Sequence, residues 1–457
     1  MVGFILLGLF VVIEIALLVV TFTKQQEKKC WLQNRVIFRV GETVLFFLAL
    51  LLPQAAWDFR FKLCFFILII RVATALIIYA IKRKKVTGSK SKIGAVANMI
   101  FGILLLALSL TPAFLFTGYQ GLPTTGSYEV KHISAILTDE SRTETFETDG
   151  SKREVPVHFY YPETEIADEN SFPLVIFSHG AFGYYQSNSS TYMELASHGY
   201  VVISLDHPYH SFFTQDTTGK LITVNSNFLQ EVMSINAENV SEEELLELSH
   251  KWLTIRTEDI NFVLDGVETA ISEGILSDAW YTPSKDTADE ILKVLAMADV
   301  EEIGLMGHSL GGAASVTVGR ERNDIDAVID LDGTMLGEQL AYENGEYQYY
   351  DDPYPVPVLS IDNEEHYMLG KEGASTGTSY VNTQVLENAV ESKHTYFAGS
   401  GHMNFTDLPL FSPALASLLG TGNIDETECI ETMNEIILEF FNCYLKDEGE
   451  AIIKESY

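Results

Sequence analysis

Cysteine is scarce in this sequence, with 4 residues among 457. Cys30 and Cys64 lie in or beside apolar runs, while Cys429 and Cys443 share the periodic stretch ETECIETMNEIILEFFNCYL. If that stretch is one helix, its two cysteines are about 21 Å apart along the axis, which is too far for a disulfide. No cysteine spacing typical of a zinc site occurs. We therefore expect four structural cysteines.

Basic side chains are scarce beyond residue 117. Residues 118–457 hold 15 Lys and Arg against 59 Asp and Glu, a net charge of −44, whereas residues 1–117 hold 14 against 4, a net charge of +10. Binding to nucleic acid requires basic patches that contact phosphates, so the acidic part excludes nucleic acid as a partner. Its charge also disfavours flat contact with anionic lipid.

Long apolar runs dominate the basic part. They cover about residues 2–23, 36–57, 62–81 and 94–117, and each approaches the roughly 20 residues that a membrane-spanning helix needs. A signal peptide is a poor alternative, because the N-terminal MVGF has no basic residue and three more runs follow. The sequence predicts four transmembrane helices in residues 1–117, with the lipid bilayer as their partner.

The loops between these runs predict an orientation. The first and third loops are rich in Lys and Arg, whereas the second has only Arg60 and Lys62. Because cytoplasmic loops carry the Lys/Arg excess, loops one and three are expected inside. This predicts a multi-pass protein of the cell membrane whose acidic part is extracytoplasmic.

Four charged residues interrupt the apolar runs: Glu14, Arg39, Glu42 and Arg71. Charge inside a membrane is costly and points into a helix bundle. One interpretation is a sensor or transport path. The other, which we favour, is that paired charges fix a four-helix anchor.

The acidic part follows a Gly-, Pro- and Thr-rich linker, residues 118–128. From residue 129 to 457, strand-like runs such as PLVIFSHG and YVVISLDHP alternate with helix-like runs. This alternation predicts a mostly parallel sheet with helices on both faces. In such folds sites gather at the carboxyl ends of strands.

The stretch IGLMGHSLGGAAS (303–315) has the pattern Gly307-x-Ser309-x-Gly311 between a strand-like and a helix-like run. In a nucleophile elbow, the sharp strand-to-helix turn that carries the serine, there is no room for side chains at the two glycine positions. The pattern predicts that Ser309 is a nucleophile that attacks an acyl carbonyl.

A serine hydroxyl needs a general base, and three histidines follow Ser309. His394 opens a strand-like run, and His366 follows DNEE, where a solvated side chain is expected. His402 lies in GSGHMNF just after a strand, where a loop can bring its imidazole to the elbow. We predict His402 as the base.

The acid that orients the base lies between serine and histidine in this chain order. Asp332 ends one strand, and Asp362 and Glu365 end the next. Asp330 alternates with Asp332 and is expected to face away. We favour Asp332 and keep Asp362 as an alternative.

Oxyanion donors in such sites are the amide after the nucleophile and one from an early loop. These would be the backbone N–H groups of Leu310 and of Ala181, the latter in FSHGAFG.

The stretches KREVPVHFYYP, PLVIFSHGAFG, ELASHGYVVISLDHPYH, GHSLGGAAS, DLDG and GSGHMNF occur in this order. Together they resemble the platelet-activating-factor acetylhydrolase family of the α/β-hydrolase superfamily, plasma type and bacterial relatives, over roughly residues 127–445. The resemblance implies Asp332 as the acid, Ala181 as an oxyanion donor, and hydrolysis of short-acyl or phospholipid-like esters without metal or other cofactor. The sequence departs from the family in its membrane runs and its long acidic insert, 211–250, in which Phe212, Phe213 and Phe228 could form a lid.

Three alternatives stay open. VIDLDGTM also matches the motif of phosphatases that use an aspartate nucleophile and Mg²⁺, here Asp330. A polyesterase or dienelactone-hydrolase relative would use Asp362 as its acid. A non-catalytic membrane protein could have kept the fold for binding or signalling.

Overall fold

The computed structural model describes residues 2–23, 27–52, 57–164, 170–236, 240–376 and 380–457. The chain forms two compact units. The first comprises Met1–Gln120 with Leu410–Leu415, and the second comprises Gly121–Pro409 with Ala416–Tyr457. The expected boundary near residues 118–128 falls at the junction, but the first unit also contains a short segment from late in the chain.

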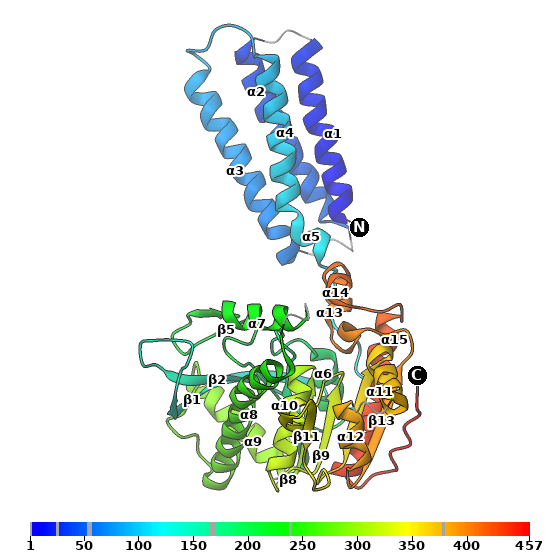
Figure 1. The fold of residues 1–457 in the computed structure, drawn as a ribbon. Helices are drawn as coiled ribbons and strands as arrows, with labels where there is room; N and C mark the ends of the chain where they lie inside the picture. Colours follow the sequence, from blue (N-terminus) through cyan, green and yellow to red (C-terminus); the bar gives the residue numbers. More distant parts are fainter. Residues whose placement is uncertain (1, 24–26, 53–56, 165–169, 237–239, 377–379) are drawn as a thin grey trace. The chain divides into compact units, whose positions relative to one another are not determined.

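The first unit is a bundle of helices (Figure 1). Asp58 and Ser91 cap the third and fourth helices by accepting hydrogen bonds from backbone amides. Phe10, Phe46 and Leu106 are among the side chains that form its core. The helices are α1 (Val2–Thr23), α2 (Lys28–Ala49), α3 (Phe59–Lys82), α4 (Lys92–Ser109) and α5 (Thr111–Leu115).

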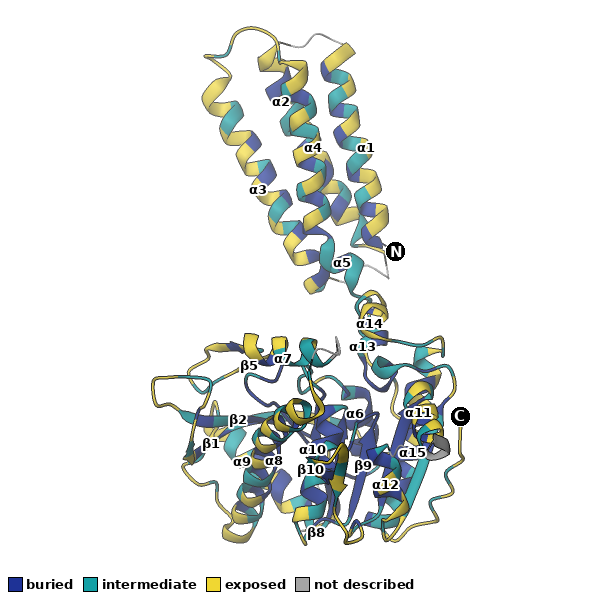
Figure 2. Ribbon diagram, viewed as in Figure 1, coloured by how far each residue is buried: buried dark blue, intermediate teal, exposed yellow. Residues whose placement is uncertain are grey.

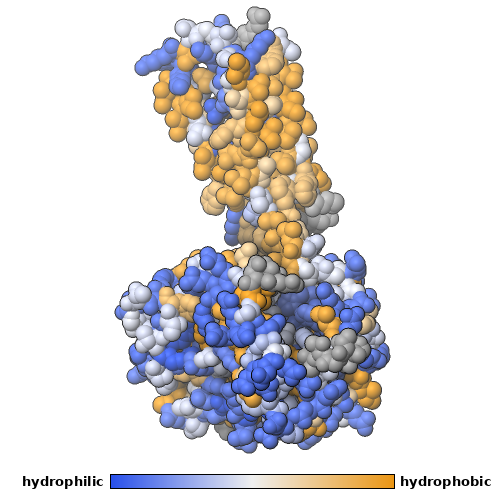
Figure 3. Space-filling view, viewed as in Figure 1, coloured by the Kyte–Doolittle hydropathy of each residue, from blue (hydrophilic) through white to orange (hydrophobic). Residues whose placement is uncertain are grey.

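Within the described part of this bundle, three helices, not the four that we predicted, are long and apolar enough to cross a membrane: α1, α3 and α4. Helix α2 covers only part of the second apolar run, 36–57, and begins with polar turns that contain Lys28, Lys29 and Arg35. Residues 53–56 of that run lie outside the described residues. Large apolar side chains are exposed along the helices, which gives the bundle an apolar surface (Figure 3).

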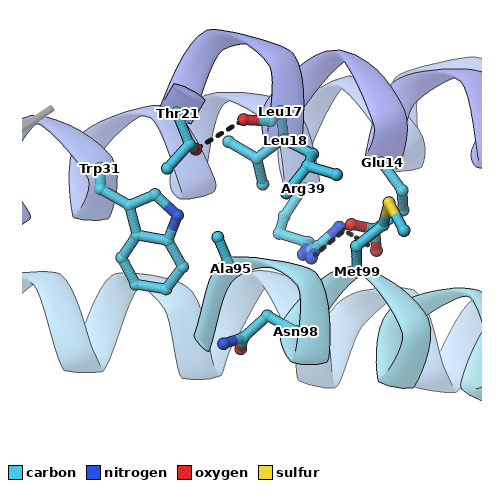
Figure 4. A pocket seen from close by; sticks show the side chains of 9 residues that line it. All are labelled: Glu14, Leu17, Leu18, Thr21, Trp31, Arg39, Ala95, Asn98 and Met99. Carbon is cyan, nitrogen blue, oxygen red and sulfur yellow. Dashed lines mark hydrogen bonds and ion pairs between the residues drawn. The ribbon is translucent and has the colours of Figure 1, made fainter. Parts of the chain in front are cut away.

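The four charged residues of the apolar runs meet inside the bundle. Arg39 Nη1 donates to Glu14 at 2.7 Å and to Glu42 at 2.6 Å, and Arg71 pairs with both glutamates. Next to this network lies a small pocket that Trp31 and other side chains line, and the Arg39–Glu14 pair is at its wall (Figure 4). Because a buried charge is costly unless it is paired, this geometry favours the interpretation as an anchor-fixing network.

A nine-stranded sheet forms the centre of the second unit, in the order β13-β12-β9-β8-β3-β4-β2-β1-β7. The six strands from β13 to β4 pair in parallel, and β2, β1 and β7 continue antiparallel. The predicted mostly parallel sheet is confirmed. The strands of this sheet are β1 (Val130–Thr143), β2 (Lys152–Pro162), β3 (Phe172–Ser178), β4 (Val201–Leu205), β7 (Trp280–Tyr281), β8 (Ala298–His308), β9 (Ala327–Leu331), β12 (Val358–Asn363) and β13 (Ser392–Phe397).

Helices cover the sheet, and its inner strands β3, β4 and β9 are wholly buried (Figure 2). Helices α8 and α10 pack against each other and the central strands, while α6 and α15 form a second packed pair. Ser241 caps α8 as its sequence predicts, because its side chain accepts from the Glu244 amide. The helices are α6 (Ser189–Ser197), α7 (Ser226–Asn236), α8 (Glu242–Glu273), α9 (Lys285–Met297), α10 (Leu310–Glu321), α11 (Glu364–Thr376), α12 (Val381–Glu387), α13 (Leu408–Phe411), α14 (Pro413–Leu419) and α15 (Glu426–Leu445), with 3-10 turns η1 (Leu336–Glu338) and η2 (His402–Phe405).

Small hairpins complete the second unit. The insert predicted at 211–250 forms β5 (Phe213–Gln215), β6 (Leu221–Thr223), α7 and the start of α8; its residues 237–239 lie outside the described residues. Strands β10 (Gln339–Glu343) and β11 (Glu346–Tyr349) pair antiparallel. Phe228 of the insert is buried and packs against Phe182 and Trp252, whereas Phe212 and Phe213 are exposed. The three phenylalanines of the lid hypothesis therefore do not share one environment.

Candidate active site

Ser309 lies at the turn between β8 and α10, at the carboxyl end of the parallel strands. Its backbone has φ 55° and ψ −125°, a conformation that non-glycine residues adopt at a cost of about 1–3 kcal/mol and that clusters at functional sites. A Cβ at Gly307 would lie 2.2 Å from the Gly311 carbonyl group, and one at Gly311 would lie 1.9 Å from the Ser178 carbonyl oxygen. The glycines thus permit the close turn that holds Ser309.

Asp332 and His402 are hydrogen-bonded, with 2.6 Å between His402 Nδ1 and Asp332 Oδ2. Asp332 follows β9, and its carboxylate also accepts from the Asn363 backbone and side-chain amides at 2.7 Å each. Burial raises the pKa of Asp332, but hydrogen bonds from His366 and His402 outweigh this effect, and the pKa is lowered. Asp332 is therefore an ionised group that can orient and stabilise a charged imidazole.

The imidazole of His402 lies against the ring of His308, which is the residue before Ser309 in the elbow. The two rings have centroids 4.6 Å apart, and His308 Nε2 is 3.1 Å from the His402 carbonyl oxygen. No hydrogen bond between Ser309 and the His402 ring occurs among the described residues. In enzymes without bound substrate such bonds are often long and tighten in the reacting complex.

The other predicted acid has a different partner. Asp362 Oδ2 is 2.7 Å from Nε2 of His394, and its Oδ1 accepts from Ser360 at 2.9 Å. The geometry thus favours Asp332 over Asp362 as the partner of His402.

Asp330 is completely buried, and its Oδ1 accepts from the Gly333 backbone amide at 3.1 Å. Burial raises its pKa well above the ordinary value, and the nearby charges of Asp362 and Asp332 act in the same direction. A neutral, inaccessible carboxyl group is a poor nucleophile. This burial disfavours the aspartate phosphatase alternative.

The early loop that contains Ala181 lies against the elbow. A Cβ at Gly180 would be 3.3 Å from the Cβ of Ser309. The Ala181 amide has no partner among the described residues, and Leu310 is the first residue of α10, where an amide has no intrahelical acceptor. Both predicted oxyanion donors therefore have amides available beside Ser309.

Two features of the site were not predicted from the sequence. His366, which we expected to be solvated, places its Nδ1 3.0 Å from Asp332 Oδ1, opposite the oxygen that pairs with His402. The buried Arg256 of α8 donates hydrogen bonds to the carbonyl oxygens of His179 and Gly180. No local motif marks either residue. Among the described residues, no group of three or more His, Cys, Asp and Glu side chains could hold a metal ion.

Residues 146–452 match the family described as platelet-activating factor acetylhydrolase, isoform II. The chain belongs to this family. The resemblance found in the sequence motifs is thereby confirmed, and the matched region contains the whole candidate site.

Similar proteins carry related descriptions. The platelet-activating factor acetylhydrolase of Canis lupus familiaris is 24% identical over 286 residues, which are 60% of this chain and 57% of the relative. A probable 1-alkyl-2-acetylglycerophosphocholine esterase of Arthroderma benhamiae is 23% identical over 307 residues, which are 63% of this chain and 65% of the relative. The chain thus spans less than two thirds of the length of these relatives.

Among solved structures, a ferulic acid esterase from Streptomyces cinnamoneus superposes with a TM-score of 0.52 at 18% identity, covering 73% of this chain and 94% of the esterase. This likeness shows the α/β esterase-like fold.

Proposed function

We propose that the protein is a membrane-anchored serine carboxylic-ester hydrolase that cleaves short-acyl or phospholipid-like esters. The observation that carries the proposal is the short Asp332–His402 hydrogen bond beside the strained Ser309. Family membership and the descriptions of the relatives support the same chemistry.

The reaction would proceed through an acyl-enzyme. His402 Nε2 takes the proton of Ser309 as Oγ bonds to the ester carbonyl carbon, and the carbonyl electron pair moves to oxygen. The Ala181 and Leu310 amides stabilise that oxyanion. When the intermediate collapses, the bond to the alcohol oxygen breaks and His402 protonates the leaving alcohol. Water, deprotonated by His402, then releases the acid and restores Ser309.

The anchor part of the proposal rests on the apolar helices α1, α3 and α4 and their exposed side chains. If α2, whose Arg39 and Glu42 are paired inside the bundle, crosses together with these three helices, both Lys- and Arg-rich loops lie in the cytoplasm and the second unit lies outside the cell. Its substrate would then be an ester that reaches the outer membrane surface.

The first test is hydrolysis of p-nitrophenyl esters of increasing acyl length by the full-length chain in detergent, with and without EDTA. We expect metal-independent turnover that Ser309→Ala abolishes, and the preferred acyl length reports the size of the pocket. Ser272→Ala, at an exposed serine of α8, is the matched control. Activity that needs Mg²⁺ and survives Ser309→Ala would revive the phosphatase alternative. A folded chain without turnover on any ester would favour a binding or signalling protein.

A second test separates the two possible acids. Asp332→Asn is expected to lower kcat by about 10⁴-fold, because the base loses the group that orients it and stabilises its charge. Asp362→Asn, which alters only the carboxyl group paired with His394, is expected to stay within about tenfold of the unaltered chain. The reverse ranking would assign the acid to Asp362.

A further inference from the structure

Beneath the loop that contains Ala181 lies a second Ser–His–Asp arrangement. Ser178 Oγ is 2.9 Å from His207 Nε2, and His207 Nδ1 is 2.9 Å from Asp259 Oδ2. All three residues are completely buried, so no ester reaches this serine. This buried network therefore cannot act on a substrate, and it holds neighbouring groups in place instead.

The network holds the guanidinium group of Arg256 against the loop that contains Ala181. Arg153 pairs with Asp259 at 2.6 Å and with Glu144 at 2.9 Å, and Arg142 pairs with Asp259 at 3.0 Å, so two carboxylates are matched by two guanidinium groups. Arg256 is also completely buried but forms no ion pair with a carboxylate of the described residues. It donates instead to the Ser178 hydroxyl at 3.4 Å, to the His179 carbonyl, and to the Gly180 carbonyl at 3.3 Å.

These carbonyl contacts have a consequence for the amides of the loop. A trans peptide group is planar, and its C=O and N–H bonds point in opposite directions. A donor that fixes the Gly180 carbonyl therefore fixes the direction of the Ala181 N–H, which points away from Arg256. The Gly180 oxygen also lies 2.7 Å from His179 Nδ1 and accepts from the Gly183 amide at 3.0 Å. This peptide group is thus held from several sides.

We propose that Arg256 is a positioning residue for ester hydrolysis: it holds the Gly180–Ala181 peptide so that its amide faces the oxyanion, and its charge polarises that peptide. The inference rests on the proposed function and deepens it. Arg256 touches neither substrate nor Ser309 and acts only through the loop. A hydrogen bond from a cation to the carbonyl oxygen withdraws electrons from the amide, which strengthens its N–H as a donor. The effect grows as negative charge develops in the transition state.

The test compares Arg256→Met, Arg256→Lys and the unaltered full-length chain in detergent. Rates are expressed per active site titrated with a fluorophosphonate, so that misfolded molecules are not counted. The measurements are kcat and KM for p-nitrophenyl acetate, and the inhibition constant of a trifluoromethyl ketone, which forms a hemiketal oxyanion on the nucleophilic serine. Leu253→Ala is the control, because it also removes a buried α8 side chain, but an apolar one that makes no hydrogen bond to the loop.

We expect Arg256→Met to lower kcat by about 30-fold to 300-fold, somewhat less than the roughly 10²-fold to 10³-fold loss on removal of a whole oxyanion donor. KM should change by less than about threefold, because an interaction made only in the transition state lowers kcat and kcat/KM equally, and trifluoromethyl ketone affinity should fall in parallel with kcat. Arg256→Lys keeps the charge but cannot reach both carbonyls, so a smaller parallel loss is expected. Leu253→Ala should lower the melting temperature and leave kcat per titrated site unchanged.

Two results would overturn the inference while leaving the proposed function intact. One is an Arg256 variant whose kcat and inhibitor affinity both match the unaltered chain. The other is a loss of kcat without a matching loss of inhibitor affinity, which indicates a structural role only. If Arg256→Met yields no titratable sites, the same criteria apply to Arg256→Lys. Absence of turnover by the folded, unaltered chain would instead overturn the proposed function and this inference together.

Discussion

Two imidazoles share the carboxylate of Asp332, with His402 on Oδ2 and His366 on Oδ1. Of these two imidazoles, only that of His402 lies against the ring of His308, the residue before Ser309. Burial lowers the pKa of His366, but its hydrogen bond to Asp332 and the charges of Asp332, Asp362 and Glu365 outweigh burial, so the pKa is raised above 6.5. His366 therefore binds a proton more tightly in the folded chain than in the unfolded chain.

This shift predicts a pH-dependent contribution of His366 to stability. A group with a raised folded-state pKa stabilises the fold fully below its unfolded pKa, and the contribution is lost as pH rises through the folded pKa. The melting temperature of the full-length chain should therefore exceed that of His366→Gln most at pH values below 6.5, the ordinary pKa of histidine, and the difference should shrink over the pH range above that value. Parallel curves for the two proteins over this range would contradict the raised pKa.

At the scale of elements, the sequence predicts best where the signal is local. The apolar run before Gly307 and the small residues after Ser309 identify β8 and α10, because a sharp turn permits few sequences. The strand ends likewise locate Asp332. The contact of the partly exposed His366 with Asp332 was not predicted, because it depends on α11 beginning at Glu364 and turning its third residue toward β9. Arg256 lies 77 residues from the loop that it contacts, and no local pattern encodes that distance.

Helix α2 shows the limit of apolar runs as a signal. Its first turns contain Lys28, Lys29 and Arg35, and its middle contains Arg39 and Glu42, which pair inside the bundle. With these charges, α2 falls outside the set of described helices that are apolar enough to cross a membrane. The membrane prediction depends on composition, whereas the helix boundaries depend on packing.

The same packing predicts that Arg39→Leu destabilises the first unit. The change leaves Glu14 and Glu42 to share Arg71 alone, and breaking a buried pair costs roughly 3–5 kcal/mol. Cys64 is completely buried in this unit, so its labelling by a maleimide, read by peptide mass spectrometry during heating, reports unfolding. Labelling should begin at a lower temperature than in the unaltered chain. Val44→Leu, at an exposed position of α2, should match the unaltered chain, and equal profiles for Arg39→Leu would mean that the network contributes no stability.

For the whole molecule, the division of charge is the main physical constraint. The net charge is +10 over residues 1–117 and −44 over residues 118–457. The basic loops therefore lie next to the apolar helices in the sequence, and the acidic side chains belong to the second unit. Anionic cytoplasmic lipid attracts the former and repels the latter. Both effects favour the proposed arrangement with loops one and three in the cytoplasm and the second unit on the opposite side, in which α2 crosses the bilayer together with α1, α3 and α4.

This topology can be tested in intact cells with a membrane-impermeant maleimide. Cys30→Ser and Cys443→Ser remove the two cysteines that are not buried, and single cysteines are then introduced by Ser89→Cys or Thr148→Cys at exposed positions. We expect labelling of the Thr148→Cys protein only, with Ser89→Cys labelled after the cells are permeabilised. The opposite pattern would put the enzyme unit in the cytoplasm, where its esters would have to come from the inner membrane surface. A single crossing by α4, the apolar helix between the two positions, would put Ser89 and Thr148 on opposite sides of the membrane. Labelling of both positions in intact cells would therefore mean that the basic loop between α3 and α4 is not protected by a membrane.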